Sequence, residues 1–156
     1  MSDQLPFENT FLLLKPDAVQ RGLIGRLISR IEEKGLKIVA MKMLQITPEQ
    51  AARQYECHFG KPFYPSLVEF ICSGPSVAMI IEGRGAISLC RRVIGSASPE
   101  NSQTGTIRGR YSLHVKDNLI HGSDSPESFA HEAKVYFSEE EIVKYRLDLE
   151  RWIYYS

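Results

Sequence analysis

The amino-acid sequence predicts a mixed fold of helices and strands, of the α/β or α+β class. Short apolar runs alternate along the chain with segments whose apolar residues recur at helical spacing. The 156 residues, 43% of them hydrophobic, suit one globular domain with a real core and leave little room for a second. No internal repeat or low-complexity linker divides the chain. The order of the strands does not follow from periodicity alone.

The first third of the chain is expected to form a strand, a helix and a second strand. Residues 10–15 (TFLLLK) are an apolar run that Pro16 closes, which is typical of a buried strand. Residues 23–34 place their apolar side chains on one helical stripe, which Gly35 ends. Residues 36–45 are apolar and β-branched, as in a second strand.

The middle of the chain continues the alternation. Thr47 is expected to cap a helix, with Pro48 at its first position. A short helix is expected at 65–71, a third buried strand at 76–82 (SVAMIIE) and a helix at 85–94.

A long polar segment follows, and then the last elements. Residues 95–118 are rich in Ser, Asn, Gln, Thr and Gly, and loops longer than about 12–15 residues are usually functional or disordered. A short fourth strand is expected at 118–121 and a helix at 126–137. On that helix His131 should be solvated, whereas Glu132 lies at the edge of the apolar stripe and can reach inward. The expected stripe is Phe129, Ala130, Ala133, Tyr136 and Phe137.

Composition excludes several classes of protein. Lys+Arg and Asp+Glu are both 19, whereas a protein that grips duplex DNA through its phosphates normally has a basic surplus. No apolar run approaches the ~20 residues of a membrane span, and residues 1–6 do not resemble a signal peptide. Cys57, Cys72 and Cys90 are widely spaced, which disfavours a disulfide framework or a structural zinc site. We therefore expect a soluble, cytoplasmic protein.

Several residues are candidates for binding an anion or a base. Lys15 stands at the end of the first expected strand and can face an anion, although a strand end before a helix is the simpler interpretation. Phe63 and Tyr64 lie between two prolines, so they form either a stacking platform or a core corner. Arg91, Arg92 and Arg108 are either solvated or directed at phosphate; a P-loop motif is absent, so side chains would have to bind it.

His121 is the candidate nucleophile. A lone histidine is more often structural, as we expect for His58, His114 and His131. His121 differs because it follows an apolar pair and precedes a polar turn, Gly122-Ser123-Asp124-Ser125. A carboxylate such as Glu132 that fixes one imidazole nitrogen leaves the other free as nucleophile or base.

Four motifs together resemble the nucleoside diphosphate kinase family. They are VQRGL at 19–23, KPF at 61–63, GTIRG at 105–109 and NLIHGSDS at 118–125. The resemblance extends from about residue 10 to about residue 145. It implies an α+β, ferredoxin-like βαββαβ fold with a four-stranded antiparallel sheet and surrounding helices. It also implies one kinase domain over 1–156, with its core at about 8–143 and a tail at 144–156.

The resemblance implies a nucleoside diphosphate kinase, which moves the γ-phosphate of ATP, GTP or another triphosphate to a diphosphate such as ADP. The mechanism would be ping-pong through a phosphohistidine on His121, with broad specificity for base and sugar. Mg²⁺ would arrive on the nucleotide phosphates with no protein ligand. Glu132 would hold the other ring nitrogen, with Ser123 beside it, and Lys15 would complete the catalytic group. The implied nucleotide-binding residues are Lys15, Tyr55, Phe63, Arg91, Ala97, Arg108, Val115 and Asn118, with Phe63 and Val115 on opposite faces of the base.

The chain departs from the family pattern at three positions. Ala97, followed by Ser98, stands where the family usually has Thr. Arg110 replaces a common Asp, and Arg92 replaces a usually apolar residue. These changes bear on the strength of phosphate binding.

Two alternatives compete with the kinase. A non-catalytic relative is disfavoured because His121, Lys15, Arg91, Arg108 and Glu132 occur together. A single-stranded nucleic-acid module that stacks bases on aromatic rings is disfavoured by the zero net charge and the absence of an RNP-type strand.

The end of the chain bears on assembly. The resemblance implies dimers whose sheets meet, arranged as a hexamer of D3 symmetry, with tetramers as a bacterial variant. Apolar side chains near the terminus are costly to leave in water, so we expect them to cover a neighbouring subunit of a homohexamer, or else to fold back on their own. They are Tyr145, Leu147, Leu149, Trp152, Ile153, Tyr154 and Tyr155.

Overall fold

A computed structural model describes residues 5–115 and 117–154. Its four strands form one antiparallel sheet in the order β2-β3-β1-β4. The strands are β1 (Phe7–Leu14), β2 (Lys37–Gln45), β3 (Pro75–Arg84) and β4 (Ile120–Gly122). Because β3 lies between β1 and β2, the first β-helix-β unit is split. The expected α+β, ferredoxin-like class is confirmed.

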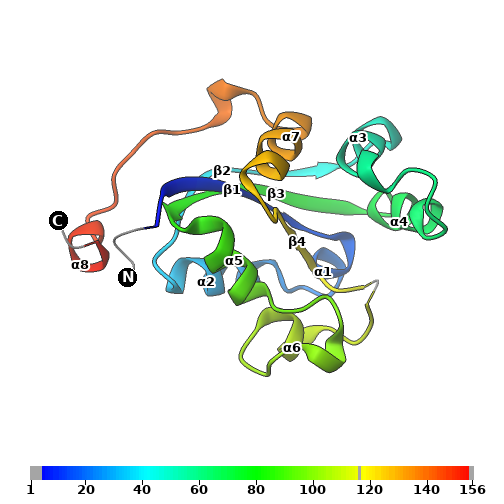
Figure 1. Cartoon of the computed structure of the whole chain (residues 1–156), viewed down its shortest axis with the longest axis horizontal. Helices are drawn as coiled ribbons and strands as arrows, with labels where there is room; N and C mark the ends of the chain where they lie inside the picture. The colour runs from blue at the N-terminus through cyan, green and yellow to red at the C-terminus, as the bar shows by residue number, and fades with distance from the viewer. Residues whose placement is uncertain (1–4, 116, 155–156) are drawn as a thin grey trace.

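Helices cover both faces of this sheet (Figure 1). Helices α3, α4 and α7 lie on one face, and α1, α2, α5 and α6 on the other. The helices are α1 (Pro16–Gln20), α2 (Ile24–Glu33), α3 (Pro48–Gln54), α4 (Tyr64–Ile71), α5 (Ala86–Ile94), α6 (Ile107–Tyr111), α7 (Pro126–Tyr136) and α8 (Glu150–Ile153). Single 3₁₀ turns occur at η2 (Glu56–His58), η3 (Pro99–Asn101) and η4 (Glu139–Glu141).

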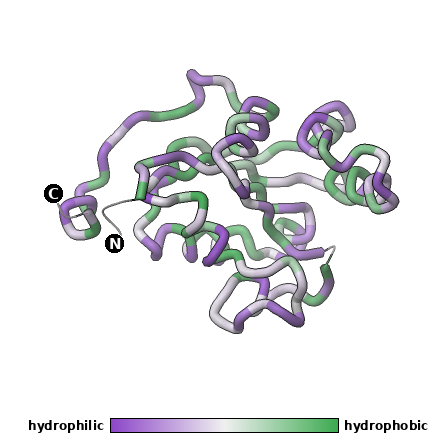
Figure 2. Tube along the Cα trace, viewed as in Figure 1, coloured by the Kyte–Doolittle hydropathy of each residue, from purple (hydrophilic) through white to green (hydrophobic). Residues whose placement is uncertain are grey.

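The central strand β1 explains why the core has two halves. Leu12 and Leu14 pack in one apolar cluster beside α1, α2 and α5, whereas Phe11 and Leu13 pack in the other beside α3, α4 and α7. A strand buried on both faces needs an apolar run rather than alternation, which is why TFLLL predicts it. Figure 2 shows the hydrophobic sheet between helices of mixed character.

Local sequence signals determine several helix ends as expected. Thr47 accepts a hydrogen bond from the Gln50 N–H, and Pro48 occupies the first helical position of α3. Gly35, just after α2, has a φ of +89°, which favours glycine over any residue with a Cβ.

Other expectations need correction. The first strand begins at Phe7, three residues early, because Phe7 pairs with Arg84 of β3. The fourth strand begins at Ile120 rather than at 118, since Leu119 has a φ of +77° that no strand residue adopts. The polar segment after α5 is not structureless, because η3 and α6 lie within it. Ala130 is exposed rather than part of the buried stripe of α7.

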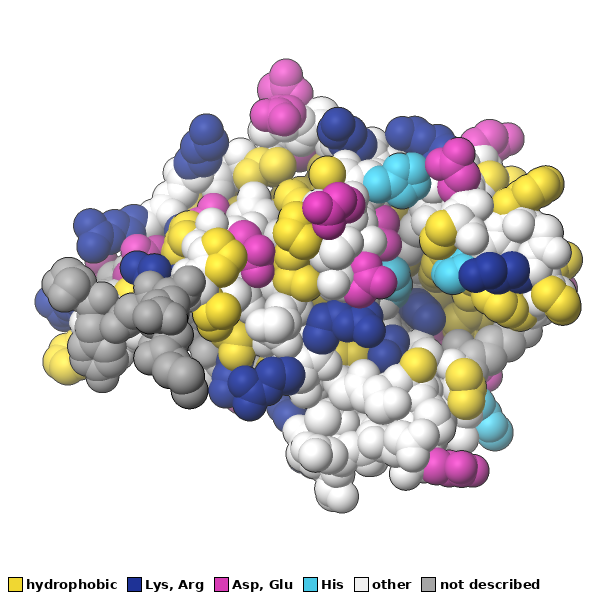
Figure 3. All heavy atoms as spheres, viewed as in Figure 1, with side chains coloured by type: hydrophobic (Ala, Val, Ile, Leu, Met, Phe, Trp, Pro, Cys, Tyr) yellow, Lys and Arg dark blue, Asp and Glu magenta, His cyan; other side chains and the backbone are white. Residues whose placement is uncertain are grey.

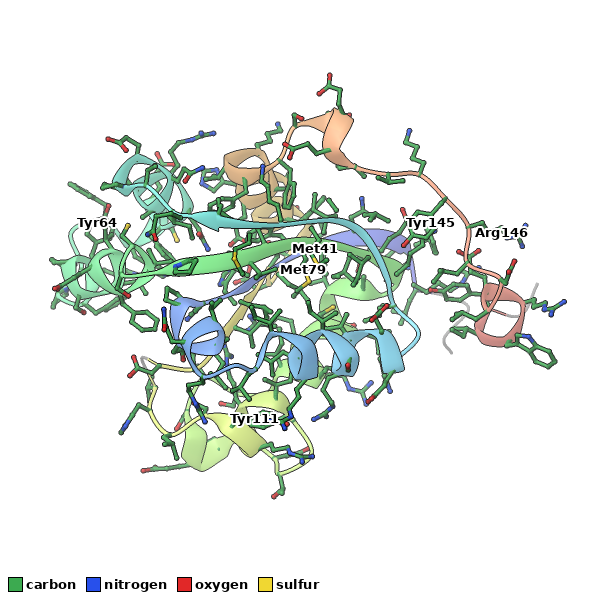
Figure 4. All side chains as sticks on the ribbon, turned by 180° about the vertical axis from the view of Figure 1, so that it is seen from behind. Met41, Tyr64, Met79, Tyr111, Tyr145 and Arg146 are labelled. Carbon is green, nitrogen blue, oxygen red and sulfur yellow. The ribbon has the colours of Figure 1, made fainter. Side chains whose placement is uncertain are left out.

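The tail contacts its own chain at several points up to residue 154, and Tyr155 lies outside the described residues. The Val143 N–H donates to the Val39 carbonyl at 2.8 Å, and the Tyr145 hydroxyl donates to the Ile38 carbonyl. A Cβ on Gly35 would lie 2.5 Å from the Ile153 side chain. In Figure 4 the strand residues Met41 and Met79 lie side by side, and the tail leaves the sheet at Tyr145 and Arg146. These contacts are those of a tail that folds back on its own chain, while Trp152 is 74% exposed and available to a neighbouring subunit.

None of the helices in residues 5–115 and 117–154 is long and apolar enough to cross a lipid bilayer.

Candidate active site

His121 is the middle residue of the three-residue strand β4. It pairs with Leu13 of β1, so the sheet determines its position. Directly opposed residues of an antiparallel pair point to the same face, which here is the face covered by α3, α4 and α7. The His121 side chain is 24% exposed, so a ligand can reach it.

A buried carboxylate holds one nitrogen of His121. The Nε2 atom lies 2.9 Å from Oε1 of Glu132, but the N–H direction does not make a straight hydrogen bond. The Ser123 hydroxyl donates to Oε2 of Glu132 at 2.6 Å, which fixes the carboxylate from its other side. No described residue forms a hydrogen bond with Nδ1. The structure thus brings His121, Glu132 and Ser123 together as expected, with Nδ1 as the free nitrogen.

Lys15 lies at the end of β1 and turns toward the segment before β4. Its ammonium donates to Oδ1 of Asn118 at 2.8 Å. The pKa of Lys15 is lowered to about 8. Burial is the largest cause and the nearby Arg108 the second, and Asp17 and Asp117 partly offset them. Lys15 is therefore largely charged at neutral pH, in a place where a positive charge is costly without an anion.

Two arginines converge on the same strand from the other side of the sheet. Arg108 of α6 donates to the carbonyls of Gly95 at 3.0 Å, Asn118 at 3.3 Å and Ile120 at 2.6 Å. Burial and Arg91 lower the pKa of Arg108 to about 10. Arg91 of α5 donates to the Gly122 carbonyl at 3.1 Å. Figure 3 shows basic and histidine side chains gathered on the surface between the α3–α4 region and the α6 region.

Tyr55 carries a hydroxyl that lacks a partner. The residue ends α3 and is only 5% exposed. Its Oη is buried and makes no hydrogen bond within the described residues. Burial raises the pKa of Tyr55, so the group stays a neutral donor. A buried hydroxyl without a partner is costly, and an oxygen of a bound ligand would satisfy it.

Two exposed apolar side chains flank this region. Phe63 begins α4 and is 48% exposed, and Val115 lies after α6 and is 60% exposed. The His58 ring contacts the edge of Phe63 at 5.3 Å, which restricts that ring. Tyr64 instead packs edge-on against Phe59 at 5.5 Å and, partly buried, against the apolar cluster beside α3.

Ala97 and His131 are two further residues that the sequence analysis singled out. Ala97 is exposed in the bend that follows α5. His131 is half exposed, as expected, and its Nε2 lies 2.6 Å from the Arg53 carbonyl. Of the four histidines, all of which the structure describes, His121 alone faces a buried carboxylate.

A separate cleft of about 900 Å³ opens between α2, α5 and the segment 95–106. Its cations are Arg30, Lys34, Arg91 and Arg92, which lie at the C-terminal ends of α2 and α5. Cations at these ends offset the helix dipoles, so their position needs no ligand. Among the residues around His121, only Arg91 also lines this cleft.

Asp17 is a residue of the site whose role the sequence did not reveal. Its Oδ2 accepts a hydrogen bond from the Leu119 N–H at 3.1 Å, two residues before His121. An acidic residue in the first turn of a helix is ordinary, and nothing in the sequence pairs it with a residue 102 positions away.

The chain is similar to a large set of known proteins. The family model described as nucleoside diphosphate kinase matches residues 8–142. A nucleoside diphosphate kinase of Carboxydothermus hydrogenoformans is 50% identical over 147 residues, covering 94% of this chain and 99% of the relative. One of Thermoplasma acidophilum is 52% identical over 138 residues, covering 88% and 93%.

Solved structures agree. A halophilic nucleoside diphosphate kinase from Halobacterium salinarum, in complex with CDP, superposes with a TM-score of 0.93 at 41% identity, covering 96% of this chain and 100% of that one. The enzyme of Aquifex aeolicus superposes with a TM-score of 0.85 at 39% identity, covering 88% of this chain and 100% of that one.

Proposed function

The chain belongs to the nucleoside diphosphate kinase family, and on that basis we propose that His121 carries the phosphoryl group between two nucleotides in a ping-pong reaction. The observation that carries this proposal is the environment of the ring: Nε2 faces the buried Glu132 carboxylate, and Nδ1 has no partner among the described residues. A carboxylate at one nitrogen orients the ring and stabilises the positive charge that develops on it.

In the first half-reaction Nδ1 attacks the γ-phosphorus of a nucleoside triphosphate. A nitrogen–phosphorus bond forms, the bond to the β,γ-bridging oxygen breaks, and the diphosphate leaves with that oxygen. Charge builds on the transferring group, where Lys15, Arg91 and Arg108 supply positive charge and Tyr55 a hydroxyl donor. Positioning and charge neutralisation are the main requirements of this chemistry.

In the second half-reaction a terminal phosphate oxygen of another diphosphate attacks the phosphohistidine. The nitrogen–phosphorus bond breaks, a new triphosphate forms, and His121 is again free beside Glu132. One site thus serves donor and acceptor in turn.

The exposed apolar pair supports broad specificity. Phe63 and Val115 would hold the base between them by stacking and apolar contact, which accept any base. The relative from Halobacterium salinarum, solved with CDP, accommodates a pyrimidine nucleotide on the same fold.

Mg²⁺ is proposed to arrive with the nucleotide. The described residues contain no group of three or more His, Cys, Asp and Glu side chains able to hold a metal ion. Lysine and arginine dominate around His121 instead, and these bind phosphate rather than metal. When bound with the nucleotide, the ion would shield the negative charge of the phosphates.

We extend the proposal to the whole chain, which would form one kinase domain with a C-terminal tail and work in the cytoplasm as a homohexamer.

Membership of the family favours the kinase over the alternative of a single-stranded nucleic-acid module. Tyr64 packs, partly buried, against the apolar cluster, which leaves the more exposed Phe63 as the stacking ring.

Phosphoryl transfer from radioactive ATP to a panel of diphosphates tests the proposal. GDP, CDP, UDP and dTDP should all become labelled triphosphates, with purines somewhat favoured by their larger stacking area. A chain without transfer would be a non-catalytic relative. A preference for one base by several orders of magnitude would contradict the stacking account.

A further inference from the structure

Leu119, which directly precedes β4, has an unusual backbone conformation. Its φ is +77°, the one positive value outside glycine among the described residues. A residue with a Cβ occupies this left-handed region only when surrounding contacts hold it there.

Both backbone groups of Leu119 bond to the segment after β1. The Asp17 carboxylate accepts the Leu119 N–H at 3.1 Å, and the Lys15 N–H donates to the Leu119 carbonyl at 2.9 Å. Leu119 is fully buried, so water cannot replace the carboxylate. Without Asp17, the N–H would be an unsatisfied buried donor.

Leu119 lies between residues that the proposed function assigns to the path of the phosphate. On one side Asn118 accepts from the Lys15 ammonium at 2.8 Å, and on the other Ile120 accepts from Arg108 at 2.6 Å. His121 follows Ile120 directly. A relaxed conformation at Leu119 would therefore shift Asn118 and His121 relative to both cations.

The charge of Asp17 acts on the same group. Its Oδ1 is buried and has no partner within the described residues. The groups that face Lys15 are Arg108 from α6, Asp17 from α1 and Asp117 from the segment before β4. Burial and Arg108 lower the pKa of Lys15, whereas the two carboxylates raise it.

We propose that Asp17 is a positioning residue for phosphoryl transfer, which holds Leu119 in its left-handed conformation and balances the charge of the Lys15 ammonium. Asp17 acts through these neighbours rather than by touching the nucleotide. The inference rests on the proposed function, because it assigns Lys15, Asn118 and His121 to the path of the phosphate.

Two variants separate the roles of the carboxylate. Asp17→Asn keeps an oxygen that can accept the Leu119 N–H and removes the charge, whereas Asp17→Ala removes both. Glu49→Gln is the matched control, because Glu49 also follows a proline at the start of a helix but is exposed. The rate of phosphoenzyme formation from ATP is measured from about pH 6 to about pH 10, with the melting temperature of each variant.

The parent should lose rate as the pH rises through about 8, where Lys15 loses its proton. In Asp17→Asn this fall should move to lower pH, since the pKa of Lys15 drops, while the rate at about pH 6 stays near the parent's. Asp17→Ala should lose about tenfold at low pH as well. Glu49→Gln should match the parent throughout.

An unchanged pH profile in folded Asp17→Asn, or a parental rate in Asp17→Ala, would overturn the inference. If Asp17→Ala does not fold, the profile of Asp17→Asn decides. A parent chain that forms no phosphoenzyme overturns the proposed function together with this inference. A parent phosphorylated on His121 whose variants all behave alike overturns the role of Asp17 alone.

Discussion

At the scale of single residues, burial sets the properties of the site. Lys15 is 6% exposed and Arg108 is 7% exposed, and burial lowers the pKa of both. Such a desolvation cost is typical of functional sites, and in the proposed reaction the phosphates of the nucleotide would supply the counter-charge. The buried Tyr55 hydroxyl has no partner among the described residues, and in the proposed reaction it would donate to a phosphate oxygen.

The buried lysine predicts a pH dependence. Because the folded-state pKa of Lys15 is about 8, kcat/KM should fall as the pH rises through that value, when the ammonium becomes neutral. Steady-state rates over a pH series measure this. In Lys15→Arg the overall rate should be lower but the fall near pH 8 should disappear, because guanidinium keeps its proton. A fall near pH 8 that persists in this variant would assign it to another group.

At position 97, restoring a hydroxyl is expected to raise kcat/KM or leave it unchanged. If a hydroxyl normally binds phosphate at this position, its absence forfeits one charge-assisted hydrogen bond of roughly 1.5–3 kcal/mol. That corresponds to about ten- to a hundredfold in affinity or rate. Ala97→Thr should therefore leave kcat/KM unchanged or raise it within this range. A clear decrease would mean that the bend after α5 positions this residue differently.

Single residues also mark where sequence reasoning ends. His121 is recognisable from its place between an apolar pair and a polar turn, and Glu132 from its place at the edge of a helical stripe. The resemblance to the family added Ser123, and the structure brings the three together. Asp17 is not recognisable, because its partner Leu119 lies 102 positions away and adopts a φ that only the folded chain imposes.

At the scale of elements, the short helix α6 matters most. It spans only Ile107–Tyr111, too short to be stable alone or to show a helical period. Thr106 accepts from the Gly109 N–H at 3.0 Å and donates to the Gln103 carbonyl at 2.6 Å. These bonds hold the helix that carries Arg108. The sequence predicted an irregular segment there because five helical residues leave no pattern.

Thr106→Ala should loosen α6. Loss of the cap should cost about 1 kcal/mol, which lowers the melting temperature by roughly 2–4 °C in a chain of this size. It should also lower kcat/KM several-fold, because Arg108 loses its fixed position. Thr47→Ala removes the comparable cap of α3 and serves as the control. If both variants lose stability equally and neither loses activity, α6 does not position Arg108.

At the scale of the whole molecule, the sheet brings together residues from distant parts of the chain. Lys15 follows β1, Arg91 lies on α5 and His121 lies in β4, and the order β2-β3-β1-β4 makes β1 and β4 neighbours. Apolar periodicity predicts the strands but not this order, since each strand could pair with several others. The resemblance to the family implied a ferredoxin-like fold with a four-stranded antiparallel sheet, which the structure confirms, and the structure adds the strand order.

Removal of the tail is expected to lower the stability of the protein. Lys37 makes ion pairs with Glu82 at 2.8 Å and with Glu150 at 3.2 Å, so residues of the tail are tied to the sheet. Removal of residues 146–156 should expose the apolar surface at Gly35 and lower the melting temperature by several degrees. Light scattering at micromolar concentration should report about six chains before and after truncation. A dimer or tetramer with the tail intact would contradict the proposed hexamer.

Identification of the phosphorylated atom tests the account most directly. After brief incubation with ATP and Mg²⁺, the protein should carry one phosphoryl group on His121, and phosphorus NMR should assign it to Nδ1, because Nε2 faces Glu132. The label should be acid-labile, should pass to added diphosphate, and should be absent from His121→Ala. Phosphate on Nε2, on Ser123, His58 or His131, or substantial turnover by His121→Ala, would contradict the account.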